Sequence, residues 1–246
     1  MRQRKVVIYT AIFGNRDTLQ EPARLPIECD FICFSDTKFS SRAWEVRQIK
    51  PSIQNDPVRS ARKFKILPHR YLPEYSVSIW VDGNIIVRGR VEELIETYLG
   101  TTNLAVYNCI NLSGNNAHST IYEETEILLT PKMRKKADPM MVKNQLATYE
   151  KAGYGGEGGL AVTSVLLRRH NKKDVVVTME EWWEHIKTYT TRDQMSFNYV
   201  AWKHNLSFSY IPGNCWDNQY FYRSNHRVSF CRKVANRIWY VSKKFI

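Results

Sequence analysis

Apolar positions along the chain fall into two patterns, which predict strands and helices in alternation. Short apolar runs that end in polar turn residues predict buried strands. They lie at residues 6–13, 31–34, 77–81, 85–87, 104–107 and 160–167. Longer segments, some with acidic residues in their first turn or apolar residues three and four apart, predict helices. They lie at residues 58–67, 91–99, 140–152 and 179–188.

This alternation favours an α/β fold with a mainly parallel central sheet flanked by helices. In such folds ligands collect at the carboxyl ends of the strands. The chain has 246 residues and 43% hydrophobic content, which is enough for one full core. We therefore expect a single domain over residues 1–246.

Charge and cysteine content narrow the choice of partner and compartment. The 36 Lys and Arg residues exceed the 24 Asp and Glu residues, so the formal net charge is +12. Such an excess favours a polyanionic partner, namely nucleic acid, an anionic membrane or a phosphorylated substrate, although solubility explains it equally well.

Five scattered cysteines without CxxC pairs, and no apolar run of 18 residues, predict a cytoplasmic protein.

Two oxygen-bearing side chains follow the run at 77–81 directly. Asp82 and Asn84 occupy alternate positions of an extended segment, and Gly83 between them lets a ligand approach the backbone. Such a pair is suited to hold Mg²⁺ or Mn²⁺ against a diphosphate. The same spacing is also typical of an ordinary Asx turn.

A basic segment precedes this strand by about twenty residues in the sequence. Arg59, Arg62 and Lys65 recur at near-helical spacing, which predicts that they face one side of a helix. A basic helical face that leads into a strand with metal ligands at its end is typical of a diphosphate cradle. A solvated helix face is the alternative interpretation.

Several further blocks occur in a fixed order along the chain. Together with the two segments above they cover residues 9–15, 33–36, 62–69, 78–85, 121–124, 159–170 and 192–197. This order resembles a glycosyltransferase-like domain-of-unknown-function family, which plants carry in proteins linked to cell-wall and mucilage polysaccharides. It is also similar to retaining glycosyltransferases of the glycogenin and galactosyltransferase type, which have the A-type (GT-A) fold. The resemblance spans roughly residues 6–200.

The resemblance implies an enzyme that moves a sugar from a nucleotide sugar, with a UDP-sugar favoured, to a carbohydrate acceptor. It implies that Asp82 and Asn84 contact Mn²⁺ or Mg²⁺ and the diphosphate. Asn84 stands where the family pattern has an aspartate, so the metal binds firmly only when the diphosphate supplies further ligands. The residues implied for the nucleotide base and ribose are Thr10, Ala11 and Asp36.

The resemblance places Asp193 and Gln194 beside the reacting sugar. The carboxylate would act as a base or orient the acceptor hydroxyl, the amide oxygen would stabilise positive charge at the anomeric carbon, and the reaction would tend towards retention. A helix N-cap is the alternative role for Asp193. Glu123 and Glu124 are expected to line the acceptor pocket or to begin an exposed helix.

A histidine near the end of such folds usually supplies the third metal ligand. His226 is the first choice, with Asp217 and His204 as alternatives. Beyond it, residues 229–246 carry apolar positions three and four apart with basic residues between them, which predicts an amphipathic helix. This helix would rest on an anionic membrane or dock on the protein's own core.

Two other functions are compatible with the sequence. A basic binding module for nucleic acid or acidic polysaccharide would use the positive charge, with Asp82 and Asn84 purely structural. Nucleic acid is the less expected partner, because the sequence contains no recognised nucleic-acid motif. A hydrolase of nucleotide sugars would share the donor site, and product analysis separates it from a transferase.

Overall fold

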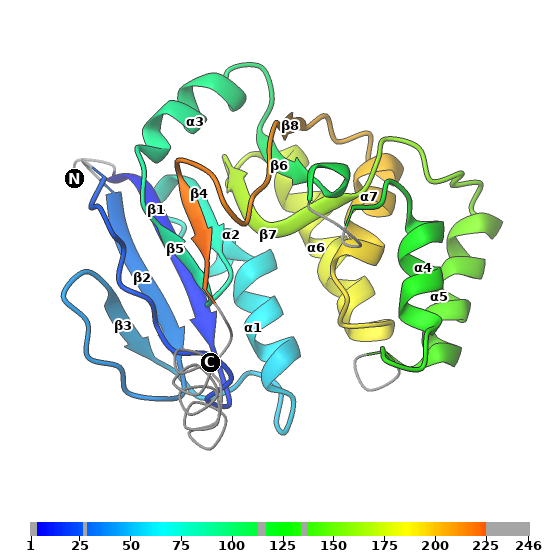
Figure 1. Cartoon of the computed structure of the whole chain (residues 1–246), viewed down its shortest axis with the longest axis horizontal. Helices are drawn as coiled ribbons and strands as arrows, with labels where there is room; N and C mark the ends of the chain where they lie inside the picture. Colours follow the sequence, from blue (N-terminus) through cyan, green and yellow to red (C-terminus); the bar gives the residue numbers. More distant parts are fainter. Residues whose placement is uncertain (1–3, 27–28, 113–116, 134–136, 225–246) are drawn as a thin grey trace, which may run out of the picture.

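A mixed sheet forms the centre of the computed structural model, which describes residues 4–26, 29–112, 117–133 and 137–224. In these ranges the main sheet has seven strands in the order β3-β2-β1-β4-β7-β6-β8 (Figure 1). They are β1 (Arg4–Ile12), β2 (Cys29–Ser35), β3 (Glu45–Gln48), β4 (Tyr75–Val81), β6 (Leu104–Asn108), β7 (Ala161–Arg168) and β8 (Ser209–Ile211). Among these seven described strands, only β7 runs antiparallel to its neighbours. The predicted α/β class with a mainly parallel sheet is confirmed.

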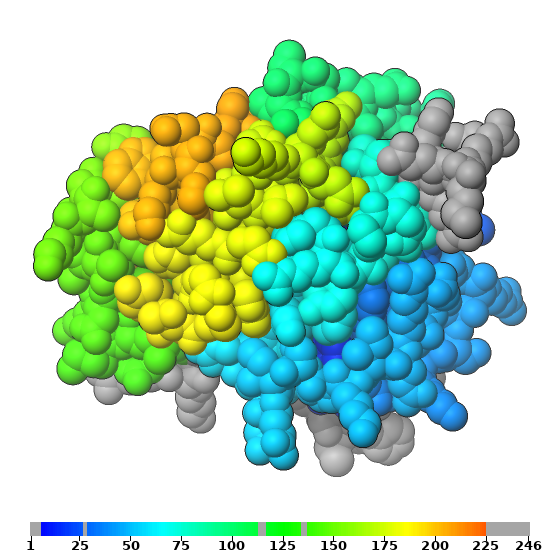
Figure 2. Space-filling view, turned by 180° about the vertical axis from the view of Figure 1, so that it is seen from behind, coloured from blue at the N-terminus to red at the C-terminus, as the bar shows by residue number. Residues whose placement is uncertain are grey.

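Helices cover the sheet, and Figure 2 shows α6 and α1 side by side on its back face. The helices are α1 (Pro57–Ile66), α2 (Pro68–Tyr71), α3 (Val91–Tyr98), η1 (Cys109–Asn111), α4 (Ile121–Leu129), α5 (Pro139–Lys151), α6 (Lys173–Thr188) and α7 (Gln194–Lys203). Val7, Ile8 and Tyr9 of β1 are fully buried, as expected for a strand covered on both faces. Within the described ranges, none of these helices combines the length and the apolar character needed to cross a membrane.

Helix α1 begins and ends at clear sequence signals. The Asp56 carboxylate accepts a hydrogen bond from Arg59 N at 2.8 Å and Pro57 opens the helix, while Pro68 follows its end. Phe64 stacks on Phe34 of β2 with ring centroids 4.6 Å apart. This packing fixes the rotation of the helix and directs its next residue, Lys65, into the protein.

Helix α7 starts at a point fixed by α6. Trp182 Nε1 donates to Asp193 O at 3.3 Å and to Ser196 Oγ at 3.1 Å. Asp193 occupies the N-cap position, yet its side chain makes no capping hydrogen bond. The N-cap role considered for this residue therefore describes its place in the backbone but not the partners of its carboxylate.

A small antiparallel sheet adjoins the end of β4. It pairs β5 (Ile85–Val87) with β9 (Phe221–Arg223). Just beyond β9, Ser224 N and Ser224 Oγ both donate to Asn84 O, at 2.8 and 3.0 Å. The last described residue is therefore bound to the turn that carries Asp82 and Asn84.

Most predicted elements are present, and the differences have physical reasons. The three missed strands, β3, β8 and β9, are only three or four residues long. Helix α7 was indicated only by the N-cap alternative for Asp193, because Gln194 to Ala201 are all buried and leave no polar face for a helical period to reveal. Helix α6 begins at Lys173 and not at 179, because packing of Val175 in the core overrides the strand preference of its valine run. The helix expected at 229–246 lies outside the described residues.

Candidate active site

The turn after β4 carries Asp82 at the carboxyl edge of the sheet. Asp82 N donates to Ser164 O at 2.9 Å, and Ile85 N closes the turn on Asp82 O at 2.8 Å. A Cβ atom on Gly83 would lie 3.0 Å from Ile12 Cγ1, so glycine is what allows β1 to approach this turn closely.

The Asp82 carboxylate is turned away from its own turn. Its Oδ1 accepts a hydrogen bond from Trp80 Nε1 at 2.8 Å and lies 3.3 Å from Lys65 Nζ. Among the described residues, its other oxygen, Oδ2, has no hydrogen-bond partner. An Asx turn would use this carboxylate to bond the nearby backbone, so that alternative does not describe the geometry.

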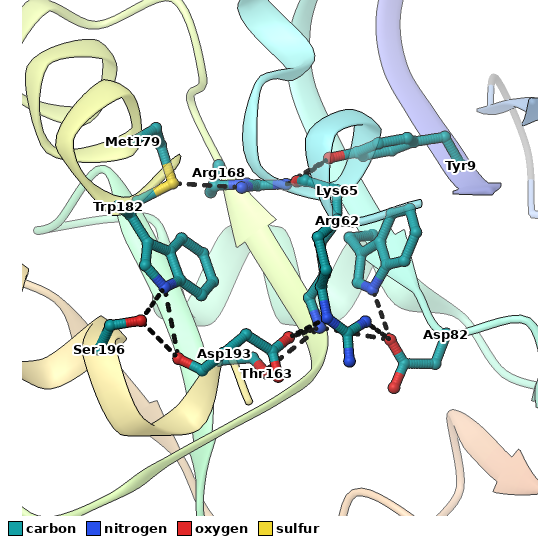
Figure 3. A network of polar contacts seen from close by, with 11 residues as sticks. Tyr9, Arg62, Lys65, Asp82, Thr163, Arg168, Met179, Trp182, Asp193 and Ser196 are labelled. Carbon is teal, nitrogen blue, oxygen red and sulfur yellow. Dashed lines mark hydrogen bonds and ion pairs between the residues drawn. The ribbon is translucent and has the colours of Figure 1, made fainter. Parts of the chain in front are cut away.

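Two basic residues of α1 join Asp82 to Asp193 (Figure 3). Lys65 Nζ lies 2.5 Å from Asp193 Oδ2 and 3.3 Å from Asp82 Oδ1, and it donates to Thr163 Oγ1 at 3.2 Å. Arg62 Nε lies 3.2 Å from Asp193 Oδ2, and its NH1 lies 3.9 Å from Asp82 Oδ1. We call Arg62, Lys65, Asp82 and Asp193 the ion-pair cluster.

The ion-pair cluster has a buried inner half and an open outer half. The side chains of Lys65 and Asp193 are 1% and 3% exposed, whereas those of Arg62 and Asp82 are 22% and 28% exposed. Burial alone raises the pKa of Asp193, but the charges of Arg62 and Lys65 outweigh it and hold that pKa well below its usual range. Asp193 is therefore an ionised carboxylate at neutral pH, fixed in place by its two partners.

A second set of buried polar groups fixes the backbone of Lys65. Arg168, at the end of β7, is fully buried and donates to Lys65 O at 2.7 Å. It also donates to the hydroxyl of Tyr9, which itself donates to Lys65 O at 2.8 Å. The last turn of α1 thus ends against the buried Arg168 guanidinium, whose positive charge stabilises the negative end of the helix dipole. The apolar run predicted at 160–167 stops one residue short of Arg168, and sequence reasoning gave this arginine no role.

A cavity of about 200 Å³ opens beside the outer half of the ion-pair cluster. Its walls are residues 11–13 at the end of β1, the first two turns of α1, and residues 80, 82 and 83 at the end of β4. Arg16 and Asp17 also line it. Arg62 and Asp82 are both part of this lining. The cavity lies at the carboxyl ends of β1 and β4, where α/β sheets usually bind ligands, and we call it the strand-end cavity.

The three residues expected to contact the nucleoside lie at or near this edge. Ala11 lines the cavity. Thr10 is buried, and among the described residues its hydroxyl has no hydrogen-bond partner. The Asp36 carboxylate accepts from Gly14 N at 3.0 and 3.2 Å and so holds the turn after β1, where Gly14 has a φ of 63°. Their roles in nucleotide binding stay predictions.

The three basic residues predicted to share one helix face are separated in the structure. Arg62 and Lys65 reach the ion-pair cluster. Arg59 instead donates to Ile186 O and Tyr189 O, both at 2.9 Å, at the end of α6. Residues three apart on a helix point in directions that differ by about 60°. Arg59, six positions before Lys65, therefore points to a different neighbour.

The predicted metal ligands are only partly accounted for. Asn84 is 5% exposed, and its Nδ2 donates to Ser224 O at 3.3 Å. His226 lies outside the described residues. Of the alternatives, Asp217 pairs with Arg88 and His204 pairs with Glu181. In the part of the chain that the structure describes, no group of three or more His, Cys, Asp or Glu residues could hold a metal ion.

A buried cluster that sequence reasoning did not predict adjoins Gln194. His118 Nε2 hydrogen-bonds Glu124 Oε2 and lies 3.6 Å from Cys109 Sγ, and Arg192 Nε lies 2.5 Å from Glu124 Oε1. Gln194 Nε2 donates to Cys109 Sγ at 3.9 Å. We call His118, Glu124, Arg192 and Cys109 the histidine cluster. It links α4 to the segment that carries Asp193 and Gln194.

The two adjacent glutamates lie in different surroundings, and the acceptor-pocket role considered for them stays a prediction. Glu123 begins α4, since its carboxylate accepts from Ser119 N at 2.7 Å and its own N–H donates to Thr120 Oγ1 at 3.2 Å. Glu124, only 1% exposed, belongs to the histidine cluster. In the sequence, only the presence of two adjacent glutamates indicated that Glu124 lies near the candidate site.

The histidine cluster predicts a specific loss of stability at high pH. Hydrogen bonds to Cys109 and to Glu124 raise the pKa of His118 from 6.5 to about 10. The stability that this shift contributes is fully present below the unfolded pKa and is lost as the pH rises through about 10. Between pH 7 and 10, the advantage of the wild type over His118→Gln in free energy of unfolding should shrink, as measured by urea titration. A constant advantage over that range would contradict the assignment.

Comparison with known proteins supports a family assignment. Residues 1–226 match the model of a family described as "TOD1/MUCI70, glycosyltransferase-like domain". This match confirms the family resemblance noted in the sequence. A comparison with curated proteins finds no match.

Three solved glycosyltransferase structures are similar at a lower level. WbbM, a bifunctional glycosyltransferase, is 11% identical with a TM-score of 0.45, over 85% of this chain and 38% of WbbM. Mouse xyloside xylosyltransferase 1 is 12% identical with a TM-score of 0.43, over 84% of each chain. GlyE of Streptococcus pneumoniae TIGR4 is 11% identical with a TM-score of 0.41, over 86% of this chain and 46% of GlyE. Similarity at this level is too low to transfer a function.

Proposed function

Because this chain belongs to the TOD1/MUCI70 family of glycosyltransferase-like domains, we propose that it transfers a sugar from a nucleoside diphosphate donor to a carbohydrate acceptor. The favoured donor is a UDP-sugar. The observation that carries this proposal is the ion-pair cluster, whose exposed half, Arg62 and Asp82, opens on the strand-end cavity. A donor bound there would have its nucleoside in the cavity and its sugar towards Asp193.

The charges around the cavity suit a diphosphate. The Arg62 guanidinium is 22% exposed and lines the cavity, so it can donate to phosphate oxygens without leaving Asp193. Lys65 is enclosed, and its ammonium is already shared between two carboxylates. We therefore assign phosphate binding to Arg62, and to Lys65 the task of holding Asp82 and Asp193 in a fixed relation.

The residues present fit a divalent metal that takes further ligands from the donor. Asp82 Oδ2 has no hydrogen-bond partner among the described residues, and its side chain is 28% exposed at the cavity. Mg²⁺ is commonly held by one or two carboxylates together with substrate phosphates, and Mn²⁺ accepts the same oxygen ligands. Asp82 would hold the ion, with Asn84 and His226 as the further ligands. Such a metal offsets the charge that builds on the leaving diphosphate.

Asp193 and Gln194 would contact the transferred sugar. The low pKa of Asp193 makes it a weak base but a strong hydrogen-bond acceptor. We therefore propose that Asp193 orients hydroxyl groups of the sugar and does not remove a proton. An inverting transferase needs a general base at the acceptor hydroxyl, so this property supports the retaining outcome. Gln194, held by Cys109, would present its amide oxygen to the anomeric carbon.

UDP together with Mn²⁺ should raise the melting temperature. Saturation at a hundredfold excess over Kd adds about 2.7 kcal/mol to the free energy of unfolding. For a chain of 246 residues this corresponds to a shift of roughly 5–10 °C in differential scanning fluorimetry. UDP alone and Mn²⁺ alone should each give a much smaller shift.

The comparison with other nucleotides and with one variant makes this test decisive. GDP and ADP with Mn²⁺ serve as controls for the base, and Asp82→Ala should remove the part of the UDP shift that depends on Mn²⁺. If none of the three nucleotides changed the melting temperature in the presence of metal, the proposed donor site would be wrong.

A further inference from the structure

A second pocket, of about 350 Å³, lies between α3 and the loop that leads into β9. Its floor consists of the buried side chains of Leu94, Tyr107 and Ile211, and its walls are the half-buried rings of Tyr98 and Tyr220. Figure 1 shows α3 beside β6 and β8, the two strands that supply Tyr107 and Ile211. We call it the tyrosine pocket. None of its described lining residues also lines the strand-end cavity.

Hydrogen bonds hold the loop wall of the tyrosine pocket in one arrangement. Asn218 Oδ1 accepts from Tyr220 N at 2.8 Å, and Asn218 Nδ2 donates to the Tyr107 hydroxyl at 3.3 Å. The loop also packs tightly against Gly89, since a Cβ atom there would lie only 2.2 Å from Gln219 O. Because this wall is already ordered, binding of a ligand costs little conformational entropy in the loop.

The lining chemistry favours an uncharged ligand with hydroxyl groups. Two tyrosine rings offer flat apolar faces, while Thr97 and Gln219 offer a hydroxyl and an amide group at the rim. Although the chain carries a net charge of +12, none of the described residues that line this pocket is basic. Phosphates and acidic sugars would find no counter-charge here. A neutral sugar ring has an apolar face and a polar rim, which matches these surfaces.

We propose that the tyrosine pocket binds one or two sugar units of a neutral glycan, away from the reacting end. A volume of about 350 Å³ lies at the lower end of the range for ligand pockets and suits a ligand of that size. The choice of a glycan rests on the proposed function, because a transferase for carbohydrate acceptors gains affinity by holding the acceptor at a second point. The loop of residues 212–220 contributes Asn218 and Tyr220 to this pocket and leads into β9, after which Ser224 N donates to Asn84 O at 2.8 Å. One chain segment thus runs from the tyrosine pocket to the turn that carries Asp82.

Binding of defined oligosaccharides tests the proposal without any need for activity. Cellohexaose, xylohexaose and mannohexaose serve as neutral probes, hexagalacturonate is the acidic comparison, and titration calorimetry with saturation-transfer NMR gives affinity and contact. At least one neutral hexasaccharide should bind saturably, and hexagalacturonate should bind at least tenfold more weakly. Tyr98→Ala and Tyr220→Ala should each weaken binding about tenfold, as expected for loss of an aromatic anchor.

Two further variants separate the pocket from general effects on folding. Tyr220→Phe keeps the ring and removes only the hydroxyl, which bonds Glu93 Oε2 at 3.2 Å, so binding should change less than about threefold. Tyr222→Ala removes an exposed tyrosine of the same strand region that does not line the pocket, and it should bind like the wild type. No saturable binding by any neutral probe, or equal losses in Tyr222→Ala and Tyr220→Ala, would overturn the proposal.

The same proteins distinguish this inference from the proposed function. The melting shift with UDP and Mn²⁺ should be unchanged in the pocket variants, since they do not line the strand-end cavity. Oligosaccharide binding without any nucleotide shift would refute the donor site and leave the tyrosine pocket standing. A shift in melting temperature with nucleotide, without oligosaccharide binding, would refute the tyrosine pocket and leave the donor site standing.

Discussion

Replacing Asp82 with asparagine is expected to lower the turnover of sugar transfer by roughly 10²–10³-fold, the usual cost of losing one preorganised electrostatic group. Asparagine keeps an oxygen in place to accept from Trp80 Nε1, so the turn should persist. The substitution removes the negative charge that faces the cavity and offsets Arg62 and Lys65. Initial rates of UDP release, measured over a range of UDP-sugars and Mn²⁺ concentrations, give kcat and the Mn²⁺ requirement. The Mn²⁺ concentration at half-maximal rate should rise together with the fall in kcat.

A matched control for this variant is Asp174→Asn. Asp174 is exposed in the first turn of α6, where it accepts from Asn103 Nδ2 at 2.9 Å, so the turnover of this variant should equal that of the wild type. If Asp82→Asn also turned over normally, the strand end would be structural only. Salt-sensitive binding of single-stranded nucleic acid or acidic polysaccharide, unaffected by that substitution, would then favour a basic binding module.

Replacing Lys65 with methionine should both destabilise the protein and abolish transfer. Its ammonium is the closest partner of Asp193, at 2.5 Å, and both side chains are almost fully buried. Removal of one partner from a buried pair leaves an uncompensated charge and typically costs about 3–5 kcal/mol. Urea unfolding at pH 7 should show a loss of that size, and donor turnover should fall below detection because Asp193 is no longer held.

A double variant separates the structural part of this effect from the catalytic part. Lys65→Met combined with Asp193→Asn removes both charges of the inner pair and should recover more than half of the lost free energy of unfolding. Turnover should stay absent, because the carboxylate proposed to contact the sugar is gone. A double variant as unstable as Lys65→Met alone would show that the charges of the two side chains are not coupled.

The sequence was sufficient to predict the sheet and the edge on which the candidate site lies. Apolar runs that end in polar turns mark the ends of parallel strands, and those ends share one edge. This reasoning placed Asp82 correctly relative to β4, whereas Ala11, which lines the same cavity, was named only by the family resemblance. Helical spacing was a weaker guide, since it grouped Arg59 with Arg62 and Lys65 although Arg59 contacts the end of α6.

The partners of the buried charges could not be predicted in this way. Lys65 and Asp193 are 128 positions apart, and Arg168 and Tyr9 are 159 apart. Periodicity shows which face of an element is buried, but it carries no information on which buried charge meets which. The histidine cluster was hidden for the same reason, because Glu124 of α4 and Arg192, in the connection between α6 and α7, are 68 positions apart.

The separation of Lys65 and Asp193 along the chain also has a consequence for biosynthesis. During translation, the β1–α1–β4 unit is synthesised more than a hundred residues before Asp193. Until α7 has been synthesised and docked, Lys65 lacks the carboxylate of Asp193, which offsets the free-energy cost of burying its charge. Asp82 is then the only carboxylate of the ion-pair cluster beside Arg62 and Lys65. An incomplete nascent chain therefore lacks part of the ion-pair cluster, and the proposed donor site forms only after the carboxyl-terminal half has folded onto the amino-terminal half.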